Sequence, residues 1–399
     1  MAIIVESLSD YIRKIEKYDL YECIYRGEKS EHKSSGILST ILRDNKMFSY
    51  KNILSDFYFE MEPTLKPLSK IHFIAYARHH SIPTNLIDFS FSPLIALYFA
   101  CNDNVNSNGQ VHFIKNYRLV PINDLIIDNE LGWTGMPNLI NCDVDLINNL
   151  SSKISSINFS LELQNFLYES LIKILCELQK CAKAAKEYNA YNKLDEIIHK
   201  LKVVTSSKNG EQNYHIFKKL YNFLTSPQSL FTPYTKNKLD EHNPIIDNTK
   251  QILINNDFLF GNGLSKCILI TYSRIANYYR LPYKKSPINV NFPFIFTYTT
   301  PCIHERIRNQ QGTFVFQMYD VLLSYQHIKP DQTFIINKEH KERIKTELEH
   351  LGFNDKFIYC DNDHIAQYII EKNDQSYNKA KRKDLIKLAE QSKTIDIDF

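Results

Sequence analysis

The sequence predicts an α+β fold in which a mixed sheet with flanking helices is interrupted by a helical insertion. Short runs of strand character cluster towards both ends of the chain, and helical periodicity dominates the middle. The chain has 399 residues, of which 43% are apolar, so it can bury a large core and is not disordered as a whole. We therefore expect the two ends to form one split domain and the insertion to pack on its side.

Helices and strands are predicted in turn along the N-terminal part. Apolar spacing indicates a helix at 8–18, a strand at 21–25, a helix at 71–78 and a strand at 86–89. Pro83 disfavours helix at the residue before it, which ends the second helix.

The next helix, at 94–100, has a clear start. Ser92 can accept hydrogen bonds from free N–H groups, and Pro93 fits the first turn because its missing donor is not needed there. A polar loop at 102–109 and a strand at 110–114 follow.

The middle of the chain carries a heptad-like apolar stripe on a long helix, with steps of four and three residues. Its flanks show no regular complementary charges, so packing on its own domain is favoured over an intermolecular coiled coil. The other faces carry lysines, which predicts one packed face and one basic face, open to an acceptor or a partner. The stripe is Leu167, Leu171, Ile174, Leu178, Cys181, Ala185 and Tyr188, and the lysines are Lys173, Lys180, Lys183 and Lys186.

Strand character returns near the C-terminus, at 292–298, 312–319, 333–336 and 356–360. Helices are expected at 338–351, with Gly352 as the C-cap, and at 363–372. These patterns divide the chain into a first domain part at 1–118, a mainly helical insertion at 119–271, a second domain part at 272–372, and a polar basic tail at 373–399. The tail is expected to be a solvated helix that frays.

Composition excludes several classes of protein. The formal charge is only +3, too balanced for a basic surface that binds nucleic acid by charge alone, and ten glycines without a Walker A or dinucleotide-binding motif argue against those nucleotide enzymes. The eight cysteines lack the spacing of a zinc site, so no metal is expected. No apolar stretch has the length of a signal peptide or a membrane span, so we expect a cytoplasmic protein with reduced thiols and no membrane contact.

The first segment with chemical potential is Tyr25-Arg26-Gly27, where a permanent cation ends an apolar strand beside a residue that allows close backbone approach. A diphosphate would suit this arginine. A buried pair with Glu28 or Asp88 is the structural alternative.

The second segment, 75–100, places His79, His80, Asp88, Ser90 and Ser92 where a strand gives way to a helix. The helix N-terminus at Ser92 is a natural anion site. A Ser-His-Asp hydrolase would need a G-x-S-x-G turn, which is absent. The histidines could instead bond to backbone near Pro83.

The third segment, 301–316, runs from a dense polar set straight into an apolar strand, and an ordinary loop rarely needs so much hydrogen-bonding capacity. The polar set is Glu305, Arg306, Arg308, Asn309, Gln310 and Gln311.

In these three segments the chain resembles the FRG domain family, which is named for an aromatic- or Phe-Arg-Gly motif. Its members carry an Ala-Gln-His-(His/Tyr)-Gly-x-Pro-Thr-Arg-Leu-Leu-Asp-Trp-Thr block, an Ala-Leu-(Tyr/Phe)-Phe-Ala helix and a late Gln-Gly-x-Phe run. The matching residues are Tyr25, Arg26, Gly27, Ala77, His79, His80, Pro83, Thr84, Leu86, Asp88, Ala96, Leu97, Tyr98, Phe99, Ala100, Arg306, Ile307, Gln310, Gln311, Gly312 and Phe314. The residues that depart from the pattern are Arg78, Ser81, Asn85, Ile87, Phe89 and Ser90.

The order of these motifs also resembles an ADP-ribosyltransferase core, which implies a split mixed sheet and NAD as the substrate. By that resemblance Arg26 orients the NAD phosphates or ribose, Ser90 or Ser92 supports the nicotinamide ribose, and Gln311 takes the position of the catalytic glutamate. Gln311 carries no charge, so Glu305 or Asp88 would have to act as the catalytic carboxylate. The implied NAD-binding residues are Tyr25, Arg26, Gly27, His79, His80, Thr84, Ser90, Ser92 and Gln310.

The resemblance thus implies NAD-dependent ADP-ribosyl transfer, or NAD glycohydrolysis, by a bacterial toxin or phage-defence effector. The acceptor would be a macromolecule, either protein or nucleic acid, or water, and the oligomeric state stays open. The alternative is a non-catalytic nucleotide- or nucleic-acid-sensing module of a defence system. A hydrolase that uses His80 and Asp88 is the third hypothesis.

Overall fold

The protein is represented by a computed structural model, which describes the greater part of the chain. Parts of the insertion and of the basic tail, including 225–259 and 393–399, lie outside the described residues. The described residues are 3–30, 37–43, 50–102, 106–128, 135, 138–139, 143–156, 161–204, 219–224, 260–280, 286–287, 292–319 and 324–392.

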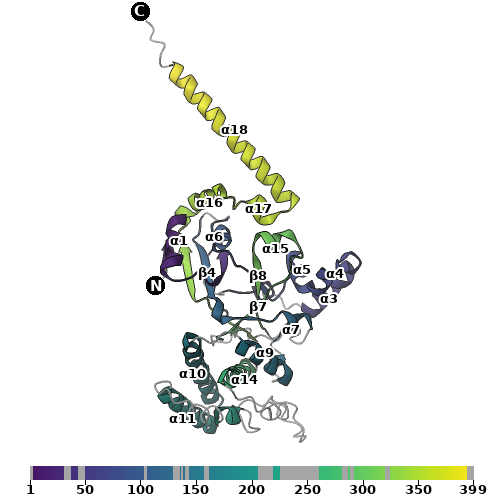
Figure 1. Cartoon of the computed structure of the whole chain (residues 1–399), viewed down its shortest axis with the longest axis vertical. Coiled ribbons are helices and arrows are strands. Elements are labelled where there is room, and N and C mark those ends of the chain that lie inside the picture. Colours follow the sequence, from purple (N-terminus) through teal and green to yellow (C-terminus); the bar gives the residue numbers. More distant parts are fainter. Residues whose placement is uncertain are drawn as a thin grey trace, which may run out of the picture.

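A mixed sheet of eight strands lies at the centre of the described chain, in the order β1-β10-β4-β2-β3-β8-β7-β5 (Figure 1). The inner neighbours pair antiparallel, and the two outermost pairs are parallel. The predicted α+β class is confirmed. The strands are β1 (Ile3–Val5), β2 (Cys23–Glu28), β3 (Leu86–Ser90), β4 (Gly109–Lys115), β5 (Leu119–Pro121), β7 (Ile295–Tyr298), β8 (Gly312–Phe316) and β10 (Gln332–Ile336). A small parallel pair joins β6 (Ser286–Pro287) to β9 (Ser324–Tyr325).

The sheet consists of two halves with a weak junction. β2 pairs with β4 along all six of its residues, and β3 pairs with β8 along all five. Between β2 and β3, by contrast, only Tyr25 and Ser90 are in register. The two halves therefore diverge from this pair, which opens the sheet in the middle.

Helices α1 (Leu8–Lys17), α6 (Pro93–Cys101), α16 (Lys341–His350) and α17 (Asp355–Tyr359) share one apolar core with the half that contains β2. Helix α6 begins as predicted, because Ser92 accepts a hydrogen bond from the backbone N–H of Ile95. The smaller helices are α2 (Thr40–Arg43), α3 (Tyr50–Met61), α4 (Pro67–Ile71), α5 (Phe73–His79), α7 (Asn123–Ile127) and α15 (Glu305–Asn309), with 3-10 turns η1 (Glu62–Thr64), η2 (Asn116–Arg118) and η3 (Lys338–His340).

The helical insertion packs below the sheet in Figure 1, through helices α9 (Val144–Ser156), α10 (Leu161–Ala184), α11 (Tyr188–Val204) and α14 (Phe260–Arg280). Its core is continuous with Leu86, Phe314 and Phe316 of the sheet. The predicted stripe is buried from Leu167 to Cys181.

The last two positions of that stripe, Ala185 and Tyr188, were placed wrongly on the same helix. Helix α10 ends at Ala184, the chain turns through Lys186 at a φ of 62°, and Tyr188 begins α11 with its side chain exposed. Two elements also cross the predicted limits of the insertion. β5 belongs to the sheet, and α14 continues to Arg280.

One expectation near the C-terminus is wrong. The segment 356–360 is not a strand but the end of helix α17, which Asn354 caps by accepting a hydrogen bond from the backbone N–H of Phe357. A short apolar run cannot be assigned to strand or helix by periodicity alone. The helix ends at Tyr359, and Cys360 is its C-cap, in the left-handed region at φ 59°. The helix predicted at 363–372 is continuous with a helical tail in α18 (Asn362–Ser392), which projects from the body (Figure 1).

Helix α16 has Leu351 as its C-cap, and the predicted Gly352 follows directly, with a φ of 93° in the left-handed region that ends helices. None of the helices in the described part of the chain combines the length and apolar character that crossing a bilayer requires.

Gly27 is required because helix α6 crosses β2 at very short range. A Cβ atom at this position would lie 1.8 Å from the backbone oxygen of Ala96. Gly109 on β4 meets the same helix, because a Cβ there would lie 2.1 Å from the oxygen of Ala100. These glycines let the backbone of α6 pack directly against β2 and β4. This contact fixes the position of Arg26, which directly precedes Gly27 on β2 and lies beside the junction with β3.

We therefore expect Gly27→Ala to lower the free energy of unfolding by about 3 kcal/mol or more, because the obstructing atoms belong to backbone and cannot move aside. Urea denaturation measures this change. Gly312→Ala is the matched control, since its Cβ would have no neighbour closer than 3.5 Å. Equal losses in the two variants would contradict the close approach of α6.

Candidate functional site

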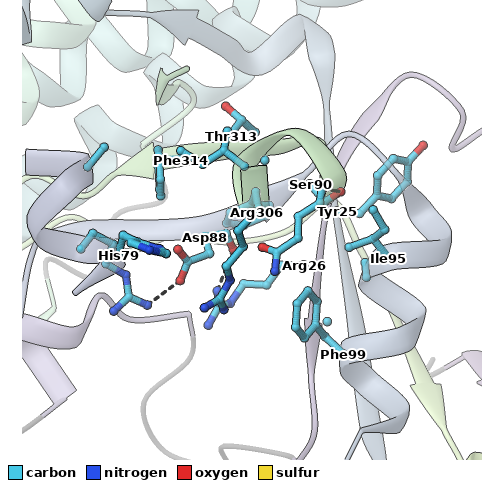
Figure 2. Close-up of a pocket in the computed structure, with 18 of the residues that line it drawn as sticks. Tyr25, Arg26, His79, Asp88, Ser90, Ile95, Phe99, Arg306, Thr313 and Phe314 are labelled. Atoms are coloured by element: carbon cyan, nitrogen blue, oxygen red, sulfur yellow. Dashed lines mark hydrogen bonds and ion pairs between the residues drawn. The ribbon is translucent and has the colours of Figure 1, made fainter. Parts of the chain in front are cut away.

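A pocket with a volume of about 310 Å³ lies where β2 and β3 diverge (Figure 2). Strands β2, β3 and β8 and helices α5, α6 and α15 contribute to its lining. Segments near both ends of the chain thus meet in one cavity. The pocket lies at the weak junction between the two halves of the sheet, where backbone pairing leaves room for side chains.

Arg26 is held at both sides of its guanidinium. Its Nε donates to the carboxylate of Glu28 over 2.9 Å, and its Nη1 donates to the backbone oxygen of Asp88 over 2.7 Å. The second bond crosses from β2 to β3 next to their single register pair. Both structural alternatives of the sequence analysis are therefore partly realised, with the Glu28 carboxylate and the Asp88 main chain as partners. With respect to the described residues, the remaining N–H groups of Arg26 are available to a ligand.

Among the described residues that line the pocket, Asp88 is the one with a carboxylate side chain. Its Oδ2 accepts from Arg78 over 2.5 Å, and its side chain is 51% exposed. Partial burial alone would raise the pKa of Asp88, but the positive charges of Arg78 and Arg26, with that of Arg306, outweigh it and hold the pKa below its ordinary value. Asp88 is therefore ionised at neutral pH.

Arg306, on α15, points into the same space as Arg26 and Asp88 (Figure 2). Its guanidinium lies 5.1 Å from the centre of the Tyr359 ring, a cation–π distance. Among the described residues no carboxylate lies close enough to form an ion pair with it. With Arg26 and Arg78, it gives the pocket three cations against one carboxylate.

Two imidazoles form a flat stack at the wall of the pocket. The rings of His79 and His304 lie 3.7 Å apart between centres, at an angle of 25°. Burial lowers the pKa of His304 to about 4, and the positive charges of His79 and Arg306 add to this effect. Burial also lowers the pKa of His79, together with the positive charge of His80. Both rings are therefore neutral at neutral pH. In the part of the chain that the structure describes, the buried Nδ1 of His304 has no hydrogen-bond partner, and neither does the Nε of Arg78.

The structure brings seven of the predicted site residues to this pocket: Tyr25, Arg26, Gly27, His79, Asp88, Ser90 and Gln310. The hydroxyl of Tyr25 points away from it, donating to the backbone oxygens of Leu20 and Tyr21. Ser90 donates to the backbone oxygen of Gln310 over 2.6 Å and accepts from the N–H of Ser92. The hydroxyl hydrogen of Ser90 is thus already used, to tie β3 to the turn after α15.

Five predicted residues do not line the pocket: His80, Thr84, Ser92, Glu305 and Gln311. The ring of His80 packs at a tilt of 52° against that of Tyr76. Thr84 is buried, and its backbone N–H and oxygen bond to the hydroxyl of Thr40. Ser92 caps helix α6.

The two candidates for the late catalytic position are both exposed. Glu305 begins helix α15, and Gln311 occupies the turn before β8 at a φ of 46°, with its backbone oxygen accepting from Phe91. Of the candidate carboxylates, only that of Asp88 lies in the pocket.

Sequence reasoning did not assign a role in the site to Arg78, Ser81, His304 or Arg306. Arg78 and Ser81 were recognised only as departures from the family pattern, where glutamine and glycine are usual. Ser81 has a φ of 64°, the region that favours glycine, which explains the family residue at its position. The departure at position 78 could have indicated a role in the site, because its charged side chain pairs with Asp88, ten residues later.

Within the described ranges, no three side chains of His, Cys, Asp or Glu gather as ligands for a metal ion.

The model of the FRG domain family matches residues 21–109 of the chain. This range includes the Tyr25-Arg26-Gly27 motif and the block at 75–100, so it contributes most of the pocket. Arg306 and His304 come from outside it. No curated protein and no solved structure matches the chain. The likeness to ADP-ribosyltransferases stays a prediction.

The neutral state of His304 has a consequence for stability. An unfolded chain protonates its histidines near pH 6.5, whereas His304 in the fold takes up a proton only near pH 4. Between these values the unfolded chain binds more protons, so the free energy of unfolding decreases as the pH falls from about 6.5 to about 4. His304→Phe, which keeps a flat ring, should make this decrease shallower in urea denaturation at pH 7, 6 and 5. An unchanged slope would contradict the burial of a neutral imidazole.

Proposed function

We propose that this pocket binds NAD and cleaves the bond between nicotinamide and ribose, with transfer of ADP-ribose to a macromolecule or to water. The observation that carries the proposal is the convergence of Arg26, Arg78 and Arg306 around the ionised carboxylate of Asp88. Such a site offers fixed cations for a diphosphate and one anion for a developing positive charge.

Arg26 and Arg306 are the groups we assign to the diphosphate. Both guanidinium groups face the pocket, Arg26 through the N–H groups that Glu28 and Asp88 leave free and Arg306 without an ion-pair partner in the described chain. A guanidinium offers paired donors that match two phosphate oxygens. Arg78 is less available, because its charge is engaged by Asp88.

The stacked rings of His79 and His304, with Phe99 and Phe314, give the pocket flat apolar surfaces beside the charged groups. A planar base packs favourably on such surfaces. Neutral imidazoles suit the positively charged nicotinamide ring better than imidazolium groups would.

In the proposed reaction, the bond between the ribose C1′ and the nicotinamide nitrogen breaks, and its electron pair leaves with neutral nicotinamide. Asp88 offsets the positive charge that develops on the ribose. Its lowered pKa makes it a stable anion but a weak base. The acceptor then attacks C1′ and releases a proton, for which His79 is the neutral base in the pocket.

The biological setting that we propose is a bacterial toxin or phage-defence effector acting in the cytoplasm, on the basis of the family resemblance. The macromolecular acceptor, protein or nucleic acid, belongs to the same proposal.

A non-catalytic nucleotide-sensing module is the second candidate, favoured by one observation. Asp88 is paired with Arg78, and Glu305 and Gln311 lie outside the pocket, so no second carboxylate of the predicted set is at hand. Such a module would bind NAD or ADP-ribose without releasing nicotinamide.

Nicotinamide release from labelled NAD, together with calorimetric binding of ADP-ribose, separates these functions. We expect Asp88→Asn to abolish nicotinamide release while ADP-ribose still binds, because the amide keeps the shape but not the charge. Binding by the wild-type protein without nicotinamide release would instead support the sensing module.

Arg306→Ala should weaken ADP-ribose binding about tenfold to a hundredfold, the value of one or two hydrogen bonds to a charged group. Arg308→Ala is the matched control, because Arg308 is exposed on the same helix and does not line the pocket. Gln311→Ala should leave nicotinamide release and ADP-ribose binding nearly unchanged, because Gln311 does not line the pocket. An equal loss in Arg306→Ala and Arg308→Ala would contradict the assigned diphosphate site.

A further inference from the structure

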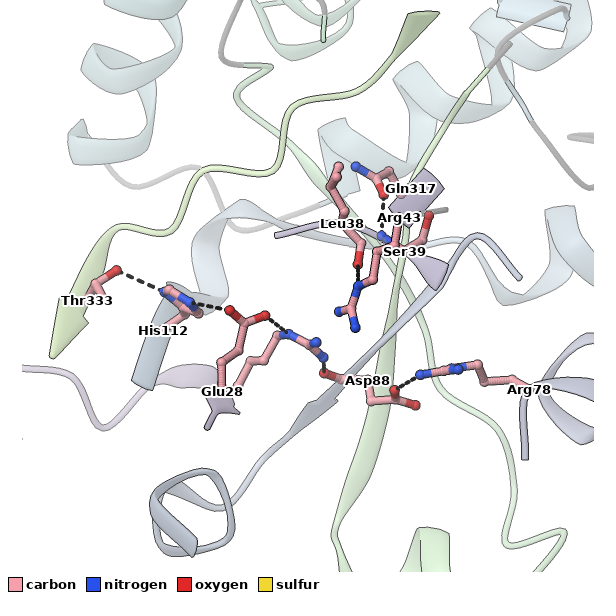
Figure 3. A network of polar contacts seen from close by, with 10 residues as sticks. Glu28, Leu38, Ser39, Arg43, Arg78, Asp88, His112, Gln317 and Thr333 are labelled. Carbon is pink, nitrogen blue, oxygen red and sulfur yellow. Dashed lines mark hydrogen bonds and ion pairs between the residues drawn. The ribbon is translucent and has the colours of Figure 1, made fainter. Parts of the chain in front are cut away.

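A row of polar side chains, Thr333, His112 and Glu28, crosses three neighbouring strands (Figure 3). Hydrogen bonds connect this row to Arg26. The strand register aligns Arg26 on β2 with His112 on β4, and His112 with Thr333 on β10. Residues in register on adjacent strands share one face of the sheet, and Glu28, two residues after Arg26, lies on that face too. The register itself therefore assembles the row.

Hydrogen bonds run along this row without interruption. The Nδ1 of His112 lies 3.0 Å from the hydroxyl of Thr333, and its Nε2 lies 3.4 Å from one carboxylate oxygen of Glu28. The other oxygen of Glu28 accepts from the Nε of Arg26. Each of the two Glu28 oxygens thus has a defined partner.

Glu28 is buried, with 7% of its surface exposed, yet it is charged. Burial alone would raise its pKa, but the hydrogen bond from His112 and the charge of Arg26 lower it to about 2. Burial of an ion pair adds little stability by itself. The role of this buried carboxylate therefore lies in its effect on its hydrogen-bond partners.

We propose that Glu28, held by His112 and Thr333, is a positioning residue that fixes the guanidinium plane of Arg26 for a diphosphate. With Nε bound to Glu28 and Nη1 bound to the Asp88 backbone oxygen, the planar group cannot rotate. Its free N–H groups are then presented to the pocket before a ligand arrives, which lowers the entropy lost on binding. The identity of the ligand as NAD rests on the proposed function, whereas the binding of a diphosphate anion by Arg26 does not.

Pyrophosphate is the probe that tests this without assuming NAD chemistry. Glu28→Gln keeps the side-chain shape and one oxygen that can accept from Arg26, but it removes the charge and the second acceptor. We expect it to weaken pyrophosphate binding about tenfold in calorimetry. Glu28→Asp, which keeps the charge, should recover most of the affinity. Asp331→Asn is the matched control, because it removes another partly buried ion pair, with Arg118, away from the pocket.

A double-mutant cycle distinguishes positioning from a structural role. In an Arg26→Gln background, where no guanidinium is left to orient, Glu28→Gln should cause no further loss of pyrophosphate affinity. A purely structural Glu28 would weaken binding in both backgrounds and would shift the unfolding midpoint in parallel.

The outcomes separate this inference from the proposed function. If the wild-type protein binds pyrophosphate with the predicted mutant pattern but neither binds nor cleaves NAD, the function fails and the positioning role stands. If it cleaves NAD and Glu28→Gln raises KM with kcat unchanged, both stand. Full pyrophosphate affinity in Glu28→Gln, or no binding of pyrophosphate by the wild-type protein, would overturn the positioning role.

Discussion

The bond from the Arg26 guanidinium to the backbone oxygen of Asp88 is the interaction on which the site depends. The two halves of the sheet share one register pair, and this side-chain bond continues their connection where backbone pairing stops. A cation is thus fixed where the strands open, and the pocket forms around it. The carboxylate of Glu28 on one side and the backbone oxygen of Asp88 on the other keep this cation in place without occupying all of its donors.

Close packing of helix α6 sets the geometry around that bond. Gly27 and Gly109 let the helix lie against β2 and β4, so the strand that carries Arg26 has no freedom to move away from it. The N-cap of the same helix is Ser92, which lies two residues after the end of β3, the strand that carries Asp88 and Ser90. Sheet register, helix contact and charge therefore act on the same few residues, which is why a short motif could reveal the site.

Much of this could be predicted from the sequence, because local signals determine it. The start of α6, the end of α16 and the meeting of Arg26 with Asp88 follow from capping residues, a left-handed glycine and strand ends. What could not be predicted depends on tertiary structure. The short apolar run at 356–360 fits strand and helix equally well, and only the fold shows that Gln311 lies on an exposed turn while Arg306 enters the pocket.

The central claim is that this pocket holds the diphosphate of a dinucleotide between Arg26 and Arg306, with the ribose beside Asp88. A crystal structure of the protein with ADP-ribose tests it most directly. The account predicts phosphate oxygens within hydrogen-bonding distance of both guanidinium groups and a flat base against the His79 and His304 stack. ADP-ribose bound elsewhere, or phosphates pointing away from Arg26, would contradict it.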